Sequence, residues 1–450
     1  MQRFHRRGSA AHACRSQPAV DRPVGGRVRG PQVMQIEVRA PAAFVLGLSE
    51  NGYGIVRSLA RAGIRVFAFH SEADEYGRLS RLCEAYRLPP RADDAALVRI
   101  LVARRARLAT APVLFATSDR YALLLARQAT ELAPHFRFHW VSARMLEAIV
   151  DKATIGAACA RAGVPAPYTR ITRADDDPLA LAREIDYPCL IKPCRFDAPF
   201  PPRLKNFLAR TRAELAGFFR AHPQTLGASI CQQVIEGGDD QVFQCTALIG
   251  AGGAPRAVFC TRKLHQYRPG FGVMCFGRSE YNETVVALAL QLLHFLGYRG
   301  LASLEFKYCA RDGRYYFIEM NPRLPWYSAL FAAAGVNLPQ LAWFDLADGA
   351  ATPPARQRDG AHWLSAKLDA GWFVSSRAAR CEGLLGWLRS IARARVFAWF
   401  DARDPLPWLR ATLALPALAV RRARAGARAQ RASGGYSSRR QGSDTLQRPV

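Results

Sequence analysis

Short apolar runs alternate with longer amphipathic stretches in the chain after about residue 40. Residues 44–48 form a continuous apolar run, and 64–69, 112–117 and 136–141 are further segments typical of strands buried in a sheet. Helix-like stretches follow the first run and end at 62, and then occupy 95–107 and 120–131. This alternation predicts a small parallel sheet wound with helices over residues 41–148. Gly47, Gly52 and Gly54 do not fit the GxGxxG spacing, so a tight strand-to-helix turn is favoured over a dinucleotide site.

The pattern changes twice further along the chain. Residues 149–225 predict a helix from Asp151-Lys152 to Ala162, ended by Gly163, and then strands and helices in alternation. Residues 226–350 are rich in strands. They predict one hairpin over 241–263, a helix over 280–296, and a second hairpin with strands 301–309 and 315–321 joined by the turn 310–313. Residues 351–420 contain five Trp and predict a helical extension. The expected fold class is therefore mixed, with α/β and α+β parts.

The net charge of +27 is concentrated at the two ends of the chain. Residues 1–40 hold eight Arg and two acids (8 − 2 = +6), and residues 411–450 hold eight Arg and one acid (8 − 1 = +7). We therefore expect disordered basic tails at 1–40 and 421–450. For the first tail, an over-extended start before Met34 is favoured over a targeting peptide. Binding of nucleic acid through the tails is an alternative that no motif supports.

Cysteine and histidine usage argues against disulfides and against a zinc or iron site. The 11 Cys are scattered singly without a CxxC pair, and the nine His show no HxH or HExxH spacing. No apolar run reaches the length of a membrane span, and no secretory signal is present. These features favour a reducing compartment, and we expect a cytoplasmic protein of unknown oligomeric state.

The second hairpin carries the most informative polar residues. Glu319 and Asn321 share parity on one strand, and the turn makes Glu305 of the other strand their neighbour. Two carboxylates and an amide oxygen form an oxygen-only site that suits Mg²⁺ held together with phosphate oxygens. Carboxylates so close repel each other unless a cation lies between them. The alternative is that both Glu are solvated on the open face of the hairpin.

Lysine is scarce in this chain, which makes the few lysines informative. Only six of the 63 basic residues are Lys, and four of them fall in or beside the proposed site elements: Lys152, Lys192, Lys263 and Lys307. Lys is a compact charge on a flexible stem, whereas Arg is a planar fork. A retained Lys in an arginine-rich chain therefore marks a place where Arg would not serve.

The run Phe317–Arg323, with Glu305 upstream, resembles the metal motif of the ATP-grasp superfamily. The resemblance covers roughly residues 42–345 and implies an N-terminal Rossmann-like pre-ATP-grasp domain at 41–148. It also implies ATP-grasp subdomains at 149–225 and 226–350, before the extension. The chain looks most similar to the carboxylate–amine ligase group, which includes D-aspartate ligase-like proteins.

The resemblance also implies roles for individual residues. Glu305, Glu319 and Asn321 are expected to hold Mg²⁺, with Mn²⁺ as an alternative, and Arg323 and Lys307 to serve catalysis. ATP is expected to contact a set of residues in four segments: Lys152, Lys192, Gln232 with Gln233 and Ile235, Asp239 or Asp240 at the ribose, and Lys263. Arg262-Lys263 is equally well explained as a plain strand end.

One departure from the superfamily concerns the loop over the phosphates. Many ATP-grasp proteins have a glycine-rich loop after the strand lysine, whereas residues 194–205 contain no glycine. Arg203 or Lys205 is expected to cover the phosphates instead.

The implied function is an ADP-forming ligase that activates a carboxylate as an acylphosphate for attack by an amine. The expected partners are therefore a small carboxylate and a small amine, whose identities the sequence does not give. Two alternatives are a biotin-carboxylase-like ligase, which the missing glycine loop disfavours, and a nucleotide-binding regulatory protein without turnover.

Overall fold

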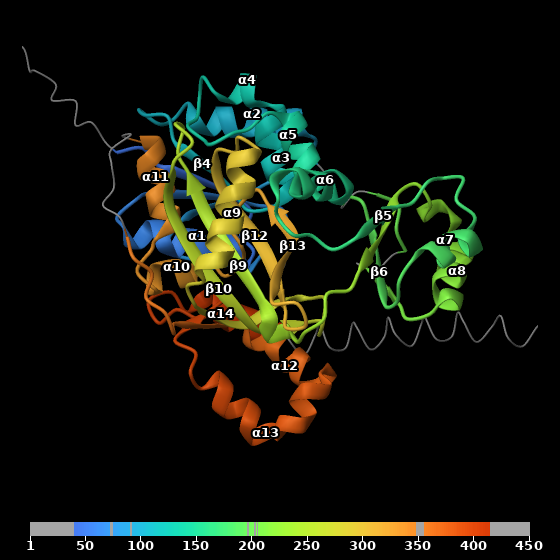
Figure 1. Cartoon of the computed structure of the whole chain (residues 1–450). Helices are drawn as coiled ribbons and strands as arrows, with labels where there is room; N and C mark the ends of the chain where they lie inside the picture. Colours follow the sequence, from blue (N-terminus) through green and yellow to red (C-terminus); the bar gives the residue numbers. More distant parts are fainter. Residues whose placement is uncertain are drawn as a thin grey trace, which may run out of the picture. The chain divides into compact units, whose positions relative to one another are not determined.

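The computed structural model describes residues 40–72, 75–90, 92–195, 198–201, 204, 206–347 and 355–414. The predicted tails lie outside these residues except for residue 40, and so do Arg203 and Lys205 of the predicted phosphate loop. Three sheets organise the described chain (Figure 1).

The first sheet is parallel, as the alternation of apolar runs predicts. Its strand order is β3-β2-β1-β4. The strands are β1 Ala43–Leu46, β2 Val66–His70, β3 Glu84–Arg87 and β4 Val113–Ala116. The helices are α1 Glu50–Arg61, η1 Tyr76–Leu79, α2 Asp94–Arg105, α3 Asp119–Arg127, α4 Ala129–Leu132 and α5 Ala143–Val150.

One strand predicted for this region is wrong. Residues 136–141 make a single bridge, between Arg137 and Val113, and no ladder. Phe136 and Phe138 are nevertheless buried in the core beside the sheet. The apolar run therefore fills the core without pairing, which the hydrophobic pattern alone does not distinguish from a strand.

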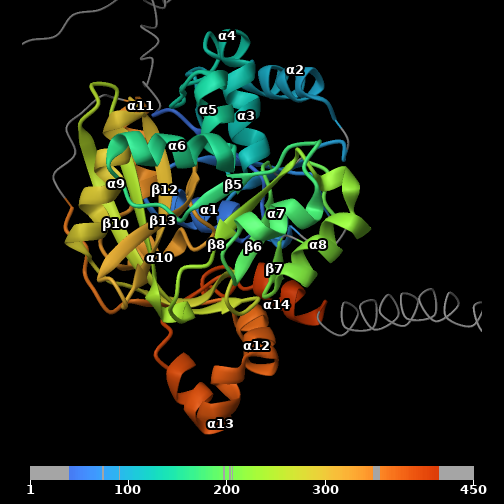
Figure 2. The ribbon, with the colours of Figure 1, turned by 45° about the vertical axis from the view of Figure 1, so that its right-hand side comes forward.

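The second sheet is small and antiparallel, with strand order β5-β8-β6-β7. Its strands are β5 Thr169–Ile171, β6 Cys189–Pro193, β7 Phe207–Ala209 and β8 Ser229–Gln233. The helices of this region are α6 Lys152–Ala162, α7 Pro178–Glu184, α8 Arg212–Ala221 and the short η2 Pro223–Thr225. Helices α7 and α8 pack their apolar side chains against the sheet in a core of its own (Figure 2).

The third sheet is the largest and has the strand order β13-β12-β9-β10-β11-β14-β15. All neighbours are antiparallel except β14 and β15. Its strands are β9 Val242–Ile249, β10 Pro255–Tyr267, β11 Val273–Ser279, β12 Gly300–Cys309, β13 Arg314–Asn321, β14 His362–Leu364 and β15 Val396–Phe397. The helices are η3 Asp239–Gln241, α9 Glu283–Phe295, α10 Ala329–Ala333, α11 Leu338–Ala347, α12 Ala366–Ser375, α13 Arg377–Ile391 and α14 Leu406–Leu413.

The two faces of this sheet differ in chemistry. Leu304 and Phe306 of β12 are buried in a core with Leu292 of α9, which lies along this face in Figure 1. Because side chains alternate along a strand, Glu305 and Lys307 point to the other face. One face is thus fixed by apolar packing, and the opposite face is free to carry polar chemistry.

The C-terminal extension is not purely helical, which corrects the prediction for residues 351–420. Strands β14 and β15 extend the large sheet beyond β11. Arg57 of α1, which is 4% exposed, also donates hydrogen bonds to the carbonyls of Phe397, Ala398 and Phe400. The extension is therefore built into the fold at two places. None of the helices in the described part of the chain is long and apolar enough to cross a membrane.

The turn between β1 and α1 gives a test of the packing. A Cβ on Gly52 would lie 1.9 Å from the carbonyl oxygen of Gly47, so the backbone would have to move. We predict that Gly52→Ala lowers the free energy of unfolding by about 1–3 kcal/mol or more, as overpacking does. Thermal and urea unfolding measure the effect.

The matched control is Gly217→Ala in α8, where a Cβ would meet nothing within 4 Å. Since Ala is a better helix former than Gly, this variant should be neutral or stabilised by up to about 1 kcal/mol. Equal stabilities for the two variants would contradict the packing of the β1–α1 turn.

Candidate functional site

The polar face of the large sheet brings the three predicted metal ligands together. Glu305 of β12 lies directly opposite Glu319 of β13 in the antiparallel register, and Ser303 lies opposite Asn321. A bulge after Glu305 shifts the register of the following residues. The Asn321 amide Nδ2 donates to Glu319 Oε1 at 3.2 Å. The predicted closeness of these residues is therefore confirmed, whereas their role as metal ligands stays a prediction.

Lys263 of β10 forms an ion pair with Glu305. Its Nζ lies 2.8 Å from Glu305 Oε2, and the two side chains are only 5% and 12% exposed. Burial raises the pKa of Glu305, an effect that Lys263 opposes and the negative charge of Glu319 increases. Lys263 therefore belongs to the site and is not a plain strand end.

Glu319 has a different environment, because its side chain is exposed to solvent while positive charges surround it. Desolvation by the neighbouring protein acts to raise the pKa of Glu319. The charges of Lys263 and Lys192 and the hydrogen bond from Asn321 outweigh it, so the pKa is lowered overall. The two carboxylates therefore differ: Glu319 is held as the anion, and Glu305 is the one that is harder to ionise.

Lys192 reaches the same region from β6 of the small sheet. Its Nζ donates to Gln232 Oε1 at 2.8 Å, and Gln232 Nε2 donates to Thr169 Oγ1 at 3.1 Å. Burial lowers the pKa of Lys192 to about 8, with the attraction of Glu319 and Glu305 opposing this shift and the charge of Lys152 adding to it. Lys192 is therefore within electrostatic reach of the two carboxylates, and its hydrogen-bond partner is Gln232.

Lys152 begins α6, which Asp151 caps by accepting hydrogen bonds from the backbone of Ala153 and Thr154. One pocket is lined by predicted nucleotide residues and predicted metal ligands together: Lys152, Gln232, Glu319 and Asn321, with Asp119 beside them. Four elements that are distant in sequence, α3, α6, β8 and β13, therefore supply one pocket.

Lys307 lies two residues from Glu305 on the same face of β12. Burial lowers its pKa, the charges of Asp239 and Glu305 oppose the shift, and Lys263 adds to it. Lys307 is therefore within electrostatic reach of the Lys263–Glu305 pair.

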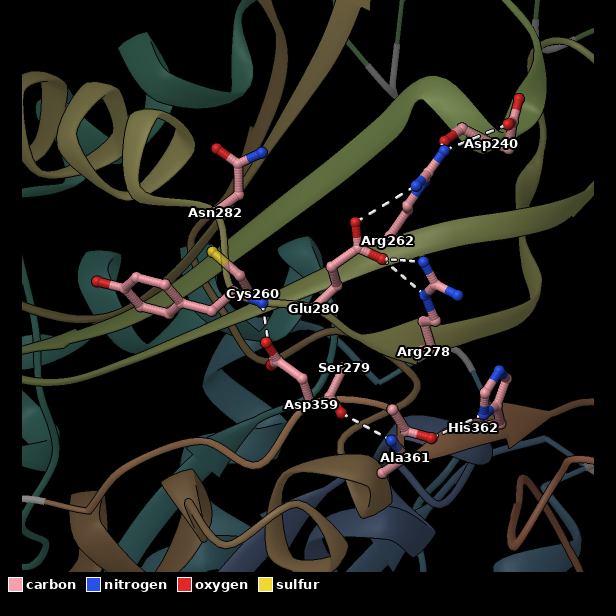
Figure 3. Close-up of polar contacts among 12 residues, drawn as sticks. Asp240, Cys260, Arg262, Arg278, Ser279, Glu280, Asn282, Asp359, Ala361 and His362 are labelled. Atoms are coloured by element: carbon pink, nitrogen blue, oxygen red, sulfur yellow. Dashed lines mark hydrogen bonds and ion pairs between the residues drawn. The ribbon is translucent and has the colours of Figure 1, made fainter.

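Asp239 and Asp240, the two residues expected to bind the ribose, form hydrogen bonds and ion pairs with different partners. Asp240 pairs with Arg262, which Figure 3 shows between Asp240 and Glu280. The Arg262 guanidinium lies over the ring of Phe243, a residue of the α9 face. The structure therefore does not bring Asp240 to the polar face.

Asp239 lies nearer the site, but its carboxylate is already bound by protein donors. Oδ1 accepts from Gln266 Nε2 at 2.8 Å and from the Gly270 amide at 2.9 Å, and Oδ2 accepts from Trp372 Nε1 at 3.3 Å. These three bonds hold Asp239 as an organising residue rather than an open acceptor for a hydroxyl.

Gln233 and Ile235 lie outside the pocket that Lys152 and Glu319 line. The backbone N–H of Gln233 donates to the Tyr168 carbonyl at 2.9 Å, and Ile235 is buried. Their part in adenine recognition stays a prediction.

Arg323 is oriented by a partner that the sequence did not suggest. Its Nε lies 2.8 Å from Asp119 Oδ1, and its Nη2 donates to Asn321 Oδ1 at 3.0 Å. Asp119 follows β4 at its carboxyl end, where ligands of parallel sheets commonly bind. That position in the sequence could have identified Asp119 as a candidate site residue. A second pocket adjoins Arg323 and is lined mainly by apolar side chains, including Leu125, Val141 and Leu324.

The donor set fits Mg²⁺ held jointly with a phosphorylated ligand. Glu305, Glu319 and Asn321 offer hard oxygen atoms, and the close carboxylates call for a cation between them. In the described parts of the chain, no group of three or more His, Cys, Asp and Glu side chains could hold a metal ion. Phosphate oxygens of a bound ligand would add to the oxygen donors of Glu305, Glu319 and Asn321.

Comparisons with known proteins agree with this arrangement. Residues 276–351, which include Glu305, Glu319 and Asn321, match the family described as "Carbamoyl-phosphate synthase L chain, ATP binding domain". The fold is similar to the biotin carboxylase domain of 2-oxoglutarate carboxylase from Hydrogenobacter thermophilus, with a TM-score of 0.55 and 16% identity over 72% of this chain and 74% of that one. The chain has the ATP-grasp fold.

Two further ATP-grasp structures are similar over comparable lengths. N5-carboxyaminoimidazole ribonucleotide synthetase gives a TM-score of 0.56 at 14% identity, over 72% of this chain and 80% of that one. The L-amino acid ligase from Bacillus licheniformis gives 0.55 at 16% identity, over 72% and 79%. A search of curated proteins found no match. The expected ATP-grasp architecture is thus confirmed at the level of the fold.

The lowered pKa of Lys192 gives a test of its expected contact with the phosphates of ATP. Lys192 is protonated below about pH 8 and loses its charge as the pH rises through that value. A bound triphosphate favours the charged form, so affinity for ATP should fall roughly fivefold to tenfold between about pH 7.5 and 9. Titration with a fluorescent ATP analogue across this range measures the fall.

The control for this prediction is Lys192→Arg, because a guanidinium stays charged throughout the range. Its affinity for the analogue should vary much less with pH. An equally steep fall in the arginine variant would show that another group titrates.

Proposed function

We propose that this chain is an ATP-dependent ligase that activates a carboxylic acid as an acylphosphate for attack by an amine and releases ADP. The observation that carries the proposal is the convergence of Lys192 and Lys263 on the opposed carboxylates Glu305 and Glu319. Anionic phosphates and a divalent cation together complement this arrangement, and neither would do so alone.

The proposed reaction has two steps. An oxygen of the substrate carboxylate attacks the γ-phosphorus of ATP, and the bond to the leaving ADP oxygen breaks. The amine nitrogen then attacks the acyl carbon of the acylphosphate, inorganic phosphate leaves, and the nitrogen loses a proton. The protein does little covalent chemistry in such a reaction, since positioning and charge neutralisation lower the barrier.

The residues divide this work according to their positions. Lys152 and Lys192 would neutralise the phosphates, and Glu305, Glu319 and Asn321 would hold Mg²⁺, which supplies further neutralisation when bound. Arg323 lies next to Asn321 and would offset charge on the transferring phosphoryl group. Lys307, close to the same carboxylates, would assist the charge balance during transfer.

Three similar structures support a ligase. They are a biotin carboxylase domain in complex with MgADP and bicarbonate, a ribonucleotide synthetase in complex with ADP, and an L-amino acid ligase. The apolar pocket beside Arg323 favours an organic acid over bicarbonate. We therefore rank the carboxylate–amine ligase above the biotin-carboxylase-like activity.

The remaining parts of the proposal concern organisation and location. We propose the domain limits 41–148, 149–225 and 226–350 before the extension, although β8 of the small sheet lies beyond the second limit. We also propose small-molecule substrates and a cytoplasmic location. Nucleic acid has no part in the proposed reaction.

The first prediction from this function is that Glu319→Gln abolishes Mg²⁺-dependent ATP consumption and leaves the fold intact. The amide keeps the shape of the side chain but removes the charge that would hold the cation. ADP release and circular dichroism of the same preparation measure the two effects.

The control is Glu131→Gln on α4, an exposed carboxylate remote from the site in sequence. It should consume ATP at the wild-type rate. Full activity in Glu319→Gln would show that the metal assignment is wrong.

The second prediction is that an acid–amine pair stimulates ADP release. A screen of amino acids and small carboxylates, each with and without amines, should find stimulation that requires both components. ATP binding without stimulation by any pair would favour a nucleotide-binding regulatory protein.

A further inference from the structure

A buried carboxylate fastens the C-terminal helix α12 to the large sheet. Asp369 is 0% exposed, and its oxygens are bound from three elements. Oδ1 lies 2.8 Å from His265 Nδ1 and 3.3 Å from Cys275 Sγ, and Oδ2 accepts from Trp387 Nε1 of α13 at 2.8 Å. A carboxylate buried with partners on all sides holds the elements that supply them in one arrangement.

Trp372 follows Asp369 by three residues and extends this contact. Its indole stacks on the ring of His265, with centroids 3.6 Å apart and an interplanar angle of 7°. A Cβ on Gly371 would lie 2.8 Å from Tyr267 Cε2, so the glycine allows the helix to approach β10 this closely. The position of the indole is therefore closely determined.

The indole N–H connects this cluster to the candidate site. Trp372 Nε1 donates to Asp239 Oδ2 at 3.3 Å, and Asp239 Oδ1 accepts from Gln266 Nε2 at 2.8 Å. Gln266 Oε1 in turn accepts from Lys263 Nζ at 3.4 Å, and Lys263 lies 2.8 Å from Glu305. A continuous chain of hydrogen bonds runs from α12 to a candidate metal ligand.

The chemistry of the end groups fixes the direction of each bond. An ionised Asp239 only accepts and the Lys263 ammonium only donates, so the Gln266 amide is held in one orientation between them. Gln266 and Lys263 are 2% and 4% exposed, so water does not readily replace a lost partner. The part of the chain of bonds from Gln266 to Lys263 is therefore shielded from solvent, and the half-buried Asp239 connects it to the indole.

We propose that the extension sets the position of Lys263 against Glu305, with Trp372 and Gln266 as positioning residues for the binding of a divalent cation with nucleotide. This inference rests on the proposed nucleotide site but not on turnover. It assigns a role to α12 and α13, for which the sequence suggested none.

The test is Trp372→Phe, which keeps an aromatic ring against His265 and removes the N–H donor together with part of the buried indole volume. The readout is binding of a fluorescent ADP analogue at increasing Mg²⁺. Losing one hydrogen bond to the half-buried Asp239 carboxylate should raise the Mg²⁺ concentration for half-saturation by about fivefold to tenfold. Affinity for the analogue without Mg²⁺ should stay close to that of the wild type, and the melting temperature should fall no more than in the matched Trp399→Phe variant.

The matched control is Trp399→Phe. Trp399 is also a buried tryptophan of the C-terminal segment, and its Nε1 donates to Glu50 Oε1 at 3.1 Å, outside the chain of bonds described above. Its Mg²⁺ dependence should match that of the wild type. An unchanged half-saturation in Trp372→Phe, or an equal shift in Trp399→Phe, would overturn the proposal.

A second variant covers the case in which Trp372→Phe does not fold. Trp387→Phe removes the donor that the half-buried Trp387 of α13 supplies to Asp369, and it should raise the same half-saturation by about twofold to threefold. No shift in this variant would count against the proposal. A wild-type protein that binds the analogue with Mg²⁺ but releases no ADP would refute the ligase and leave this proposal standing. A wild type that shows no Mg²⁺-dependent binding would overturn both.

Discussion

The direct opposition of Glu305 and Glu319 across two antiparallel strands is the constraint on which the rest of the site depends. Two carboxylates at paired positions repel each other, and the positive charges of lysines from two different sheets offset this repulsion. Lys263 lies against Glu305 in a buried ion pair, and Lys192 of β6 is within electrostatic reach of both carboxylates. The remaining negative charge is left at Glu319, which is open to solvent, and a cation with an anionic ligand can approach there.

A buried ion pair is not held in place by its own attraction alone, since the cost of removing two charges from water is comparable to the gain. Here the surrounding structure supplies the position. On one face of the large sheet, α9 and its apolar core hold β9, β10 and β12 in place. On the other face, Asp239 and Gln266 connect Lys263 to α12 of the C-terminal extension. One face of the large sheet thus carries the apolar core, and the other face carries the polar residues of the site.

The features that the sequence predicted are those encoded by short-range pattern. Residue parity and a four-residue turn were sufficient to place Glu305 beside Glu319, and the apolar runs were sufficient to predict the parallel sheet. The wrong or missing features depend on contacts between distant residues. Asp119 meets Arg323 across 204 positions, and Trp372 meets Asp239 across 133. Strands β14 and β15 are short, and they pair with strands that only the folded chain brings next to them. Asp240 forms an ion pair with Arg262, and this pairing depends on the face of β10 on which the Arg262 side chain lies. Local periodicity contains none of this information.

We propose that Glu305 and Glu319 together hold a divalent cation only when a nucleotide brings its phosphates to the lysines. Electron paramagnetic resonance of Mn²⁺, titrated into the full chain with and without ADP, measures this most directly because bound and free Mn²⁺ give different signals. The account predicts tight Mn²⁺ binding in the presence of ADP, weak binding without it, and loss of the tight binding in Glu305→Gln. Tight binding that needs no ADP, or that survives in Glu305→Gln, would contradict it.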